Sequence, residues 1–497
     1  MFSALSQIIA PLSLAICSVA SNVQQSFALD GGRLGPSGAG LFDPVKDLLS
    51  TSDYATLGHL AFPDYNVRVK KSDSVTGPAY TGYIDIKARH LFFYFFESRR
   101  NPNEDDLIFW TEGGPGCSSS IGVFMELGPC KVNDIHNVSR NPYSWNEKAN
   151  IFFVDQPVGV GFSYADHGEY DYFPKSTTEE TAKDISAFVA IFFEHFSNFK
   201  GRPFHMAGMS YGGRFIPTFA SAVYDQNAQL LAAGMTPINL TSVIIQNGCT
   251  DLKTMIPSYY NVACQHKTVA PVLGISPCIG IKQALPRCEK WLKEACYDVT
   301  DAISCRTALS FCWSHIGMPF LTSDHNPYDV TKRCTPDELN DSLCYPITKK
   351  ISSFLDRAGV RKTLGIDPST QSNFSACNDD VNRRFSASLD HVFPAEYYLE
   401  ALLERGIKVL IYVGDYDWVC NWVGNEHMTL NLDWFGKNAF VSEPLREWKI
   451  GDRAVGVTRG SGPLVFATIH GAGHMVPYDK GEEALVLVER WLAVKEL

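Results

Sequence analysis

The placement of cysteine constrains the fold of this 497-residue chain more than any other feature. Eight of its 14 cysteines lie within 81 residues in the middle of the sequence: Cys264, Cys278, Cys288, Cys296, Cys305, Cys312, Cys334 and Cys344. The chain is long enough to bury a sizeable core without cross-links, so this density indicates a disulfide-rich insertion, at about residues 249–348, within a larger fold. None of these cysteines has the C-x-x-C spacing of a zinc module, so no metal is expected.

Short apolar runs on either side of the insertion are typical of buried strands. They comprise residues 91–96, 107–110, 151–154, 205–207 and 243–245 before it, and residues 408–413 and 464–468 after it. Helical patterns lie between them, as at residues 179–195, and an amphipathic helical pattern at residues 482–494 closes the chain. The alternation of strand and helix predicts a mostly parallel sheet with helices on both faces.

The N-terminal residues have the pattern of a signal peptide for the secretory pathway. Residues 8–20 form an uncharged apolar run that ends in Ser-Val-Ala, which is typical of a cleaved signal peptide over residues 1–20. The run has no preceding Lys or Arg, so a buried N-terminal helix is the alternative. Residues 21–60 would then form an N-terminal segment, a candidate propeptide.

Sequons and charge agree with export. Four sequons for N-glycosylation begin at Asn137, Asn239, Asn340 and Asn373. No other stretch approaches the roughly 20 apolar residues of a membrane helix. The formal net charge of −11 provides no basic field for nucleic acid. We therefore expect a protein of the secretory pathway, vacuolar or extracellular, without a membrane span or a nucleic-acid partner.

The chemistry starts at the motif G-M-S-Y-G, residues 208–212. A serine hydroxyl needs a strained turn and a neighbouring base to become a nucleophile, and glycines permit the close approach of strand and helix that such a turn requires. The motif follows strand-like residues 204–207 and precedes helix-like residues 214–227, and it occurs once in the chain. Ser210 is therefore a candidate nucleophile.

A base and an acid are expected to follow the serine, each after a strand. Asp417 comes shortly after the strand-like residues 408–413, and His474 lies in a glycine-rich loop after residues 464–468. Asp415 and His470 are rivals for the same two roles, and spacing alone does not choose between them. A metal pair of His470 and His474 is disfavoured because the glutamate of H-E-x-x-H is missing.

A serine nucleophile also needs backbone N–H groups that stabilise the oxyanion. The loop G-G-P-G-C at residues 113–117 follows the strand-like residues 107–110 and suits this role. The N–H of Tyr211, directly after the candidate nucleophile, would supply a second donor. The alternative is an ordinary glycine-rich turn.

Several longer strings resemble the serine carboxypeptidases. They are WTEGGPGCSSSIGVFMELGP (110–129), NPYSWNEKANIFFVDQPVGVGFSY (141–164), GMSYGGRFIP (208–217), GDYDWVCNWVGN (414–425) and GAGHMVP (471–477). The resemblance runs from about residue 75 to the C-terminus, with the motifs in the family's order. It implies an α/β-hydrolase domain over residues 61–497, with a helical, disulfide-rich insertion above the active site. It further implies removal of C-terminal residues from peptides at acidic pH, without a cofactor.

Carried over position by position, the resemblance assigns roles to single residues. The nucleophile, acid and base match Ser210, Asp417 and His474, which favours Asp417 over the rival acid. The oxyanion donors match Gly114 and Tyr211.

The family's cysteine pattern also maps onto this chain. The resemblance implies five disulfides: Cys117–Cys377, Cys264–Cys278, Cys288–Cys312, Cys296–Cys305 and Cys334–Cys344. Cys420 matches a free thiol near the active site, which predicts inhibition by mercurials. Cys130 and Cys249 are not required by the pattern, and they either pair with each other or stay reduced.

Substrate recognition is where the chain departs from the family. There, an Asn, a following Gly N–H and a Glu hold the terminal carboxylate of the peptide, and a second Glu supports the first. The matching residues here are Glu112, Gly113, Met209 and Glu126. An Asn donates at any ordinary pH, whereas Glu112 donates only when protonated, and Met209 donates nothing.

Two enzymatic hypotheses follow, with a third of another class. The favoured one is an acid carboxypeptidase in which protonated Glu112, sharing a proton with Glu126, binds peptide C-termini below roughly pH 5. The alternative is a carboxypeptidase-like acyltransferase, esterase or amidase that acts on substrates without a free carboxylate. A non-catalytic binding protein on a hydrolase fold is the third, and the complete triad and oxyanion loop argue against it.

Overall fold

The computed structural model describes Leu49 and residues 53–58, 62–74, 77–166, 177–299, 301–368, 370 and 373–497. The expected signal peptide over residues 1–20 and most of the N-terminal segment 21–60 therefore lie outside the described residues.

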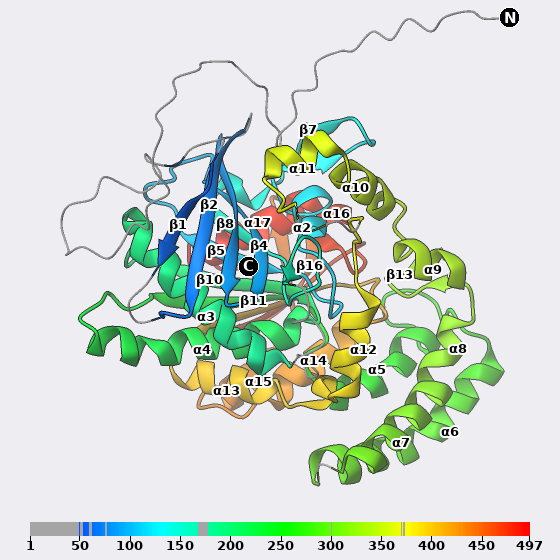
Figure 1. Ribbon diagram of the computed structural model, residues 1–497. Coiled ribbons are helices and arrows are strands. Elements are labelled where there is room, and N and C mark those ends of the chain that lie inside the picture. Colours follow the sequence, from blue (N-terminus) through cyan, green and yellow to red (C-terminus); the bar gives the residue numbers. More distant parts are fainter. Residues whose placement is uncertain are drawn as a thin grey trace, which may run out of the picture.

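A 13-stranded mixed sheet runs through the molecule (Figure 1). Its order is β1-β2-β3-β4-β8-β5-β10-β11-β14-β17-β16-β15, and β9 pairs with β4. The strands are β1 (Ala55–Gly58), β2 (Tyr65–Ser74), β3 (Gly77–Ile86), β4 (Arg89–Phe96), β5 (Leu107–Thr111), β8 (Asn150–Val154), β9 (Tyr164–Ala165), β10 (Phe204–Ser210), β11 (Leu240–Gly248), β14 (Lys408–Gly414), β15 (Arg446–Ile450), β16 (Arg453–Ser461) and β17 (Leu464–Ile469). The central strands from β8 to β17 run parallel, and antiparallel strands flank them on both sides. All seven apolar runs expected to be strands are strands.

Helices cover both faces of the sheet, as the alternating pattern predicts. Successive side chains of β5 enter opposite cores, Leu107 and Phe109 one, Ile108 and Trp110 the other. The first core includes α3 (Thr178–His195), α4 (Gly212–Ala232), α12 (Asp379–Ala387), α13 (Glu396–Glu404), α14 (Trp422–Asn431) and α15 (Lys437–Ser442). The second includes α2 (Ser120–Phe124), α10 (Ile347–Leu355), α11 (Ala358–Leu364), α16 (Val476–Asp479) and α17 (Gly481–Leu492).

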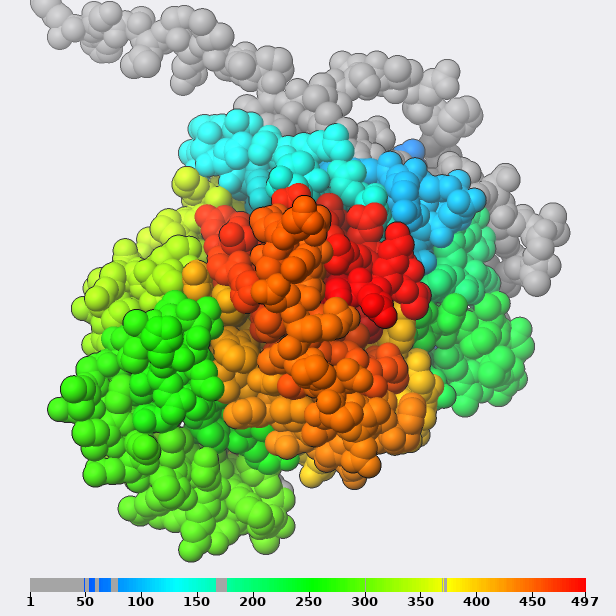
Figure 2. All heavy atoms as spheres, turned by 180° about the vertical axis from the view of Figure 1, so that it is seen from behind, coloured from blue at the N-terminus to red at the C-terminus, as the bar shows by residue number. Residues whose placement is uncertain are grey.

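The cysteine-rich segment forms a helical lobe beside the sheet, at the lower right of Figure 1 and the lower left of Figure 2. It contains α5 (Leu252–Cys264), α6 (Ile275–Leu292), η4 (Lys293–Tyr297), α7 (Ala302–Cys312), η5 (Trp313–Gly317), α8 (Met318–Leu321), the hairpin β12 (His325–Asn326) and β13 (Asp329–Arg333), and α9 (Pro336–Ser342). Its apolar side chains form a third core, which also takes in Trp418 and Cys420 from the loop after β14. The lobe therefore packs directly against a loop that carries candidate site residues.

All five disulfides implied by the resemblance are present in the structure. Four lie within the lobe, namely Cys264–Cys278, Cys288–Cys312, Cys296–Cys305 and Cys334–Cys344. The fifth, Cys117–Cys377, spans a sequence separation of 260 residues and anchors the glycine-rich loop.

The expectations for the remaining cysteines are wrong. Cys420 is not a free thiol, because it is bonded to Cys249. These residues follow β14 and β11, which are adjacent parallel strands, so the loops after them meet at one edge of the sheet with Cα atoms 5.0 Å apart. Cys130 is disulfide-bonded as well, so it neither pairs with Cys249 nor stays reduced. No cysteine is free in the part of the chain that the structure describes.

Two observations bear on the expected compartment. All four sequon asparagines are exposed to solvent. Within the described ranges, no helix combines the length and the apolar character needed to cross a bilayer.

Candidate active site

Ser210 lies in a strained turn between β10 and α4. Its φ is 57°, in the left-handed region that residues other than glycine seldom adopt. The turn brings the start of α4 very close to the sheet, since a β-carbon at Gly208 would lie 2.8 Å from Ile216 Cγ1 and 2.9 Å from Thr111 O. Strand, turn and helix thus have the form of a nucleophile elbow.

His474 and Asp417 form a buried pair, with 1% and 0% of their surfaces exposed. His474 Nδ1 lies 2.7 Å from Asp417 Oδ2. The carboxylate also accepts hydrogen bonds from Asn247 Nδ2 at 2.8 Å, Val419 N at 3.0 Å and Cys420 N at 3.3 Å. A carboxylate oxygen accepts hydrogen bonds, so the neutral His474 ring that donates Nδ1–H to Asp417 has Nε2 as its acceptor.

Sheet topology brings these three residues to one edge. Ser210 ends β10, whereas Asp417 and His474 lie in the loops after β14 and β17. These strands are parallel and, with β11, adjacent in the sheet, so their carboxyl ends point the same way. The carboxyl edge of an open α/β sheet is where ligands bind.

The rival residues pair with each other instead. His470 Nδ1 lies 2.8 Å from Asp415 Oδ2, and this hydrogen bond raises the pKa of His470. The His470 side chain is 47% exposed, in contrast to the buried His474. The structure thus separates two His–Asp pairs that sequence spacing did not distinguish.

The lobe supports the buried pair through its β12–β13 hairpin. His474 N donates to Tyr328 O at 2.8 Å, and the two rings lie 5.1 Å apart between centroids. Pro327 O accepts from the backbone N–H groups of Trp418 and Val419. Sequence analysis missed Tyr328, Pro327 and also Asn247, because no local motif links them to partners that lie far away in the sequence, as Asn247 does from Asp417, 170 positions on.

The glycine-rich loop after β5 lies against the Ser210 turn. A β-carbon at Gly113 would come within 2.5 Å of Tyr211 N and 2.8 Å of Ser210 Cβ, so only glycine fits there. Gly114 has a φ of 107°. The backbone of Gly113 therefore lies directly against both Ser210 and Tyr211.

A buried pair of carboxyl groups lies beneath this loop. Glu112 and Glu126 are each 1% exposed, and Trp110 Nε1 donates to Glu112 Oε1 at 3.2 Å. Burial, together with the neighbouring Glu126 carboxylate, raises the pKa of Glu112 well above its usual value. Burial likewise raises the pKa of Glu126, to about 7. Glu112 and Glu126 therefore form a coupled pair of carboxyl groups that retains a proton above the usual pKa of a glutamate.

Gln246 on β11 holds this pair in place and was not anticipated. Its Nε2 donates to Glu126 Oε2 at 3.0 Å and to His474 O at 3.3 Å, and Tyr412 Oη donates to its Oε1. Its Nε2 also lies 3.9 Å from the sulfur of the buried Met209. Gln246 thus supplies a polar group beside the position where the family has a Glu and this chain has Met209.

A cavity of about 230 Å³ opens between the Ser210 region and the lobe. Its lining comprises Tyr211, Arg214, Cys249, Leu252, Ile256, Tyr259, Leu309, Cys312, Trp313, Ile316, Gly317 and His391. Burial lowers the pKa of His391 to about 4, so this ring is neutral above that pH. The cavity is therefore mainly apolar and suits an uncharged side chain.

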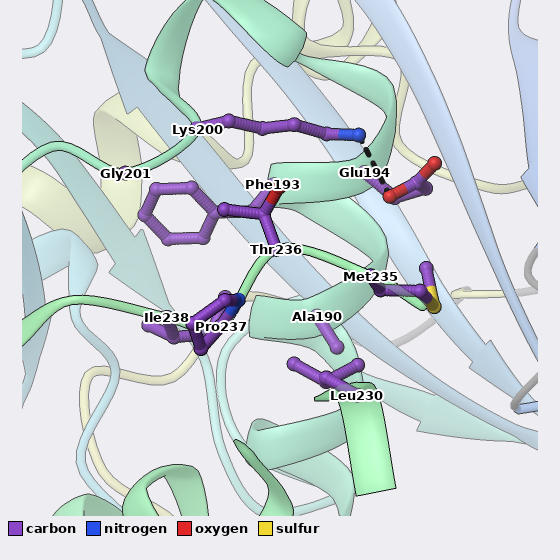
Figure 3. A pocket seen from close by; sticks show the side chains of 10 residues that line it. All are labelled: Ala190, Phe193, Glu194, Lys200, Gly201, Leu230, Met235, Thr236, Pro237 and Ile238. Carbon is purple, nitrogen blue, oxygen red and sulfur yellow. Dashed lines mark hydrogen bonds and ion pairs between the residues drawn. The ribbon is translucent and has the colours of Figure 1, made fainter. Parts of the chain in front are cut away.

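A second hollow lies away from these loops, between α3 and the connection from α4 to β11 (Figure 3). Its volume is about 10 Å³, which is room for one water at most. Lys200 at this hollow forms an ion pair with Glu194 at 2.8 Å. No candidate site residue lines it, so we assign it no ligand.

One group of side chains has the proximity of metal ligands. In the described part of the chain, potential ligand atoms of Asp417, Cys420 and His474 lie within 4.8 Å of one another. The Cys420 sulfur is in a disulfide, and the other two residues are hydrogen-bonded to each other. Their ligand atoms are thus already engaged, and we assign no metal here.

Comparison with known proteins agrees with this geometry. Residues 70–494 match the family described as serine carboxypeptidase. Carboxypeptidase Y of Candida albicans is 37% identical over 437 residues, 87% of this chain and 77% of its own. Carboxypeptidase Y homolog A of Pyrenophora tritici-repentis is 39% identical over 437 residues, which are 86% of this chain and 77% of that protein. The crystal structure of Kex1, a prohormone-processing carboxypeptidase of Saccharomyces cerevisiae, shares the fold, with a TM-score of 0.72 at 24% identity over 84% of this chain and 92% of that one. The chain therefore belongs to the serine carboxypeptidase family of hydrolases, as the sequence motifs predict.

Proposed function

We propose that Ser210, His474 and Asp417 carry the hydrolysis of C-terminal peptide bonds by this carboxypeptidase. The observation that supports the assignment best is the buried His474–Asp417 pair, at the same sheet edge as a serine with a φ of 57°. In the rival pair, the His470 side chain is 47% exposed, and Asp415 accepts one backbone N–H, from Gly471. Asp417 instead accepts hydrogen bonds from Asn247 and from two backbone N–H groups.

The reaction follows from the assigned roles. Ser210 Oγ attacks the carbonyl carbon of the last peptide bond while His474 Nε2 takes its proton, and Asp417 stabilises the imidazolium. The N–H groups of Gly114 and Tyr211 stabilise the oxyanion. His474 then returns the proton to the leaving amine, which frees the C-terminal amino acid and leaves an acyl-enzyme. Water attacks this ester by the same steps in reverse order.

Glu112 is proposed to bind the terminal carboxylate of the substrate. A neutral Glu112 donates its O–H to that carboxylate, and the N–H of Gly113 supplies a second donor. Because the pKa of Glu112 is raised, the donor persists above the ordinary pKa of a glutamate. The raised pKa supports carboxylate binding that extends above roughly pH 5. The donor is lost as the pH rises through the raised pKa, so peptide hydrolysis should decline on the alkaline side.

Gln246 and Glu126 are proposed to support Glu112 from behind. Gln246 Nε2 donates to Glu126 Oε2, and Glu126 Oε1 has no hydrogen-bond partner among the described residues. An ionised Glu126 beside Glu112 favours the protonated form of Glu112. Met209 contributes only apolar contact to this arrangement.

The substrates are proposed to be free C-termini of peptides with an apolar residue next to the scissile bond. The cavity beside Tyr211 supports this preference, because aromatic and aliphatic side chains supply most of its wall. The disulfides and the exposed sequon asparagines support a place in the secretory pathway, vacuolar or extracellular, where cysteines are oxidised.

The test is mass spectrometry of a peptide mixture incubated with the protein at about pH 5. We expect stepwise shortening from free C-termini and much slower shortening of C-terminally amidated peptides. Internal cleavage would contradict the removal of C-terminal residues, whereas products carrying an added acyl acceptor would support the acyltransferase alternative. A phosphonate fluoride should label Ser210 and leave Ser210→Ala unlabelled, which tests the nucleophile separately.

A further inference from the structure

The Cys249–Cys420 disulfide joins the loop after β11, which contacts the Ser210 turn, to the loop after β14, which carries the proposed acid Asp417. Cys249 directly follows β11, and Cys420 lies three residues beyond Asp417. The cysteines are separated by 171 residues in the sequence. They join loops that belong to neighbouring strands.

Each cysteine also holds a catalytic segment through its own backbone N–H. Cys249 N donates to Ser210 O at 2.9 Å, and Cys420 N donates to Asp417 Oδ2 at 3.3 Å. The disulfide therefore links the N–H of Cys249, which binds the Ser210 turn, to the N–H of Cys420, which binds the Asp417 carboxylate. A shift of one cysteine relative to the other would change the distance between these two groups.

Beyond the sheet, the segments after β11 and β14 meet through the packing of α5 against α14, through the Tyr259 and Trp418 rings, which lie 4.3 Å apart between centroids, and through contacts closer to the reacting groups. The pairing of β11 with β14 ends at Gln246 and Tyr412. Past that point, Asn247 accepts from Gly414 N at 3.1 Å and donates to Asp417 at 2.8 Å. The Asn247 side chain and the disulfide are thus two ties that continue the ladder to the reacting groups.

We propose that the Cys249–Cys420 disulfide is a positioning element of the active site, which keeps the Ser210 turn in register with Asp417 and makes turnover dependent on the oxidised bridge. This inference rests on the proposed roles of Ser210 and Asp417. Small displacements of reacting groups lower rate constants strongly, up to about a hundredfold for about 1 Å. Loss of the bridge should therefore reduce turnover in a protein that remains folded.

The bridge is accessible to a small reductant from one side. Cys420 is fully buried, whereas Cys249 is half-buried and lines the cavity of about 230 Å³. A thiolate of a dithiol reductant would attack Cys249 Sγ, break the S–S bond and release Cys420 as a thiolate, which takes up a proton. The second thiol of the reductant then displaces Cys249, so the protein gains two electrons and two protons while the reductant becomes a disulfide.

The test compares two double variants, each lacking one disulfide. Cys249→Ala/Cys420→Ala removes the bridge, and Cys296→Ala/Cys305→Ala removes a bridge of the lobe as the matched control. Turnover of a peptide and the rate of Ser210 labelling by a phosphonate fluoride are measured below the melting temperature of each protein. We expect kcat and the labelling rate to fall together, by about tenfold, in the first variant with KM changed by less than about twofold. The control should keep both rates within about twofold.

Retention of kcat and of the labelling rate by a folded Cys249→Ala/Cys420→Ala variant would overturn the inference. If that variant does not fold, the native enzyme is partly reduced with a dithiol, alkylated and mapped by mass spectrometry. Loss of activity should then track alkylation of Cys249 and Cys420, and active molecules with both residues alkylated would refute the role. A native enzyme that neither hydrolyses peptides nor reacts with the phosphonate would instead refute the proposed function itself.

Discussion

Replacement of Glu112 by Gln isolates the role of a single proton. The side chain is 1% exposed, and burial with the neighbouring Glu126 carboxylate keeps its pKa well above the usual value. A glutamine has nearly the same shape, and its amide donates a hydrogen bond at every pH. Glu112→Gln should therefore hydrolyse free-acid peptides without the decline in kcat/KM that ionisation of Glu112 causes in the wild type at higher pH. Glu112→Leu removes the donor at all pH values.

The size of the effect follows from the lost interaction. A hydrogen bond to a charged group contributes about 1.5–3 kcal/mol. At about 1.4 kcal/mol per factor of ten, Glu112→Leu should lower kcat/KM for a free-acid peptide by about 10- to 150-fold at low pH. The same peptide as its C-terminal amide contributes no charge to this contact, so its slow turnover should change far less.

The assay is kcat/KM for both substrates, from about pH 4 to about pH 8. Asp415→Asn is a matched control, because it also neutralises a carboxyl group near the site. The Asp415 carboxyl group contacts His470 and has no proposed role in binding the substrate. A free-acid profile in Glu112→Gln that retains the wild-type alkaline decline would refute the role of the Glu112 proton. So would a Glu112→Leu variant with wild-type kcat/KM for free-acid peptides.

Three other predictions concern the triad and stability. Ser210→Ala should abolish turnover and phosphonate labelling while leaving the melting temperature nearly unchanged, and an active variant would exclude Ser210 as nucleophile. Asp417→Asn should lower kcat by about 10⁴-fold, whereas His470→Ala should keep it within about threefold; the reverse order would assign catalysis to the rival pair. Glu112→Gln should be more stable than wild type near neutral pH and equally stable near pH 4. The reason is that the pKa of Glu112 is higher in the folded than in the unfolded protein. The stability that the Glu112 proton contributes to the wild type is fully present below the pKa of the unfolded state, and it is lost as the pH rises through the pKa of the folded state. Thermal unfolding across that range measures the difference, and a gap independent of pH would contradict it.

The Cys249–Cys420 disulfide removes the basis for the predicted inhibition by mercurials. A free Cys420 would make the enzyme sensitive to mercurials, but the bond to Cys249 leaves no thiol at that position. The resemblance could not reveal this bond, because the family pattern does not require Cys249. Only the adjacency of β11 and β14 brings the two residues together.

Local sequence determined much of the architecture. Apolar runs such as residues 408–413 became strands because continuous apolar stretches are stable only when buried on both faces. Glycines around Ser210 permitted the elbow, since any β-carbon at Gly208 or Gly113 would clash. The order of Ser210, insertion, Asp417 and His474 already required both flanks of the insertion to belong to one fold.

Tertiary structure decided what depends on contacts between distant segments. Sequence spacing left two His–Asp pairs open, and the structure separated them, because only Asp417 accepts hydrogen bonds from Asn247 and two backbone N–H groups. The proton on Glu112 likewise depends on Glu126 and on exclusion of water, and neither is visible in a local motif. Propensity and spacing act over a few residues and so specify strands, turns and motif order. Hydrogen-bond partners, burial and the Cys249–Cys420 bridge arise only where the sheet brings remote loops to one edge.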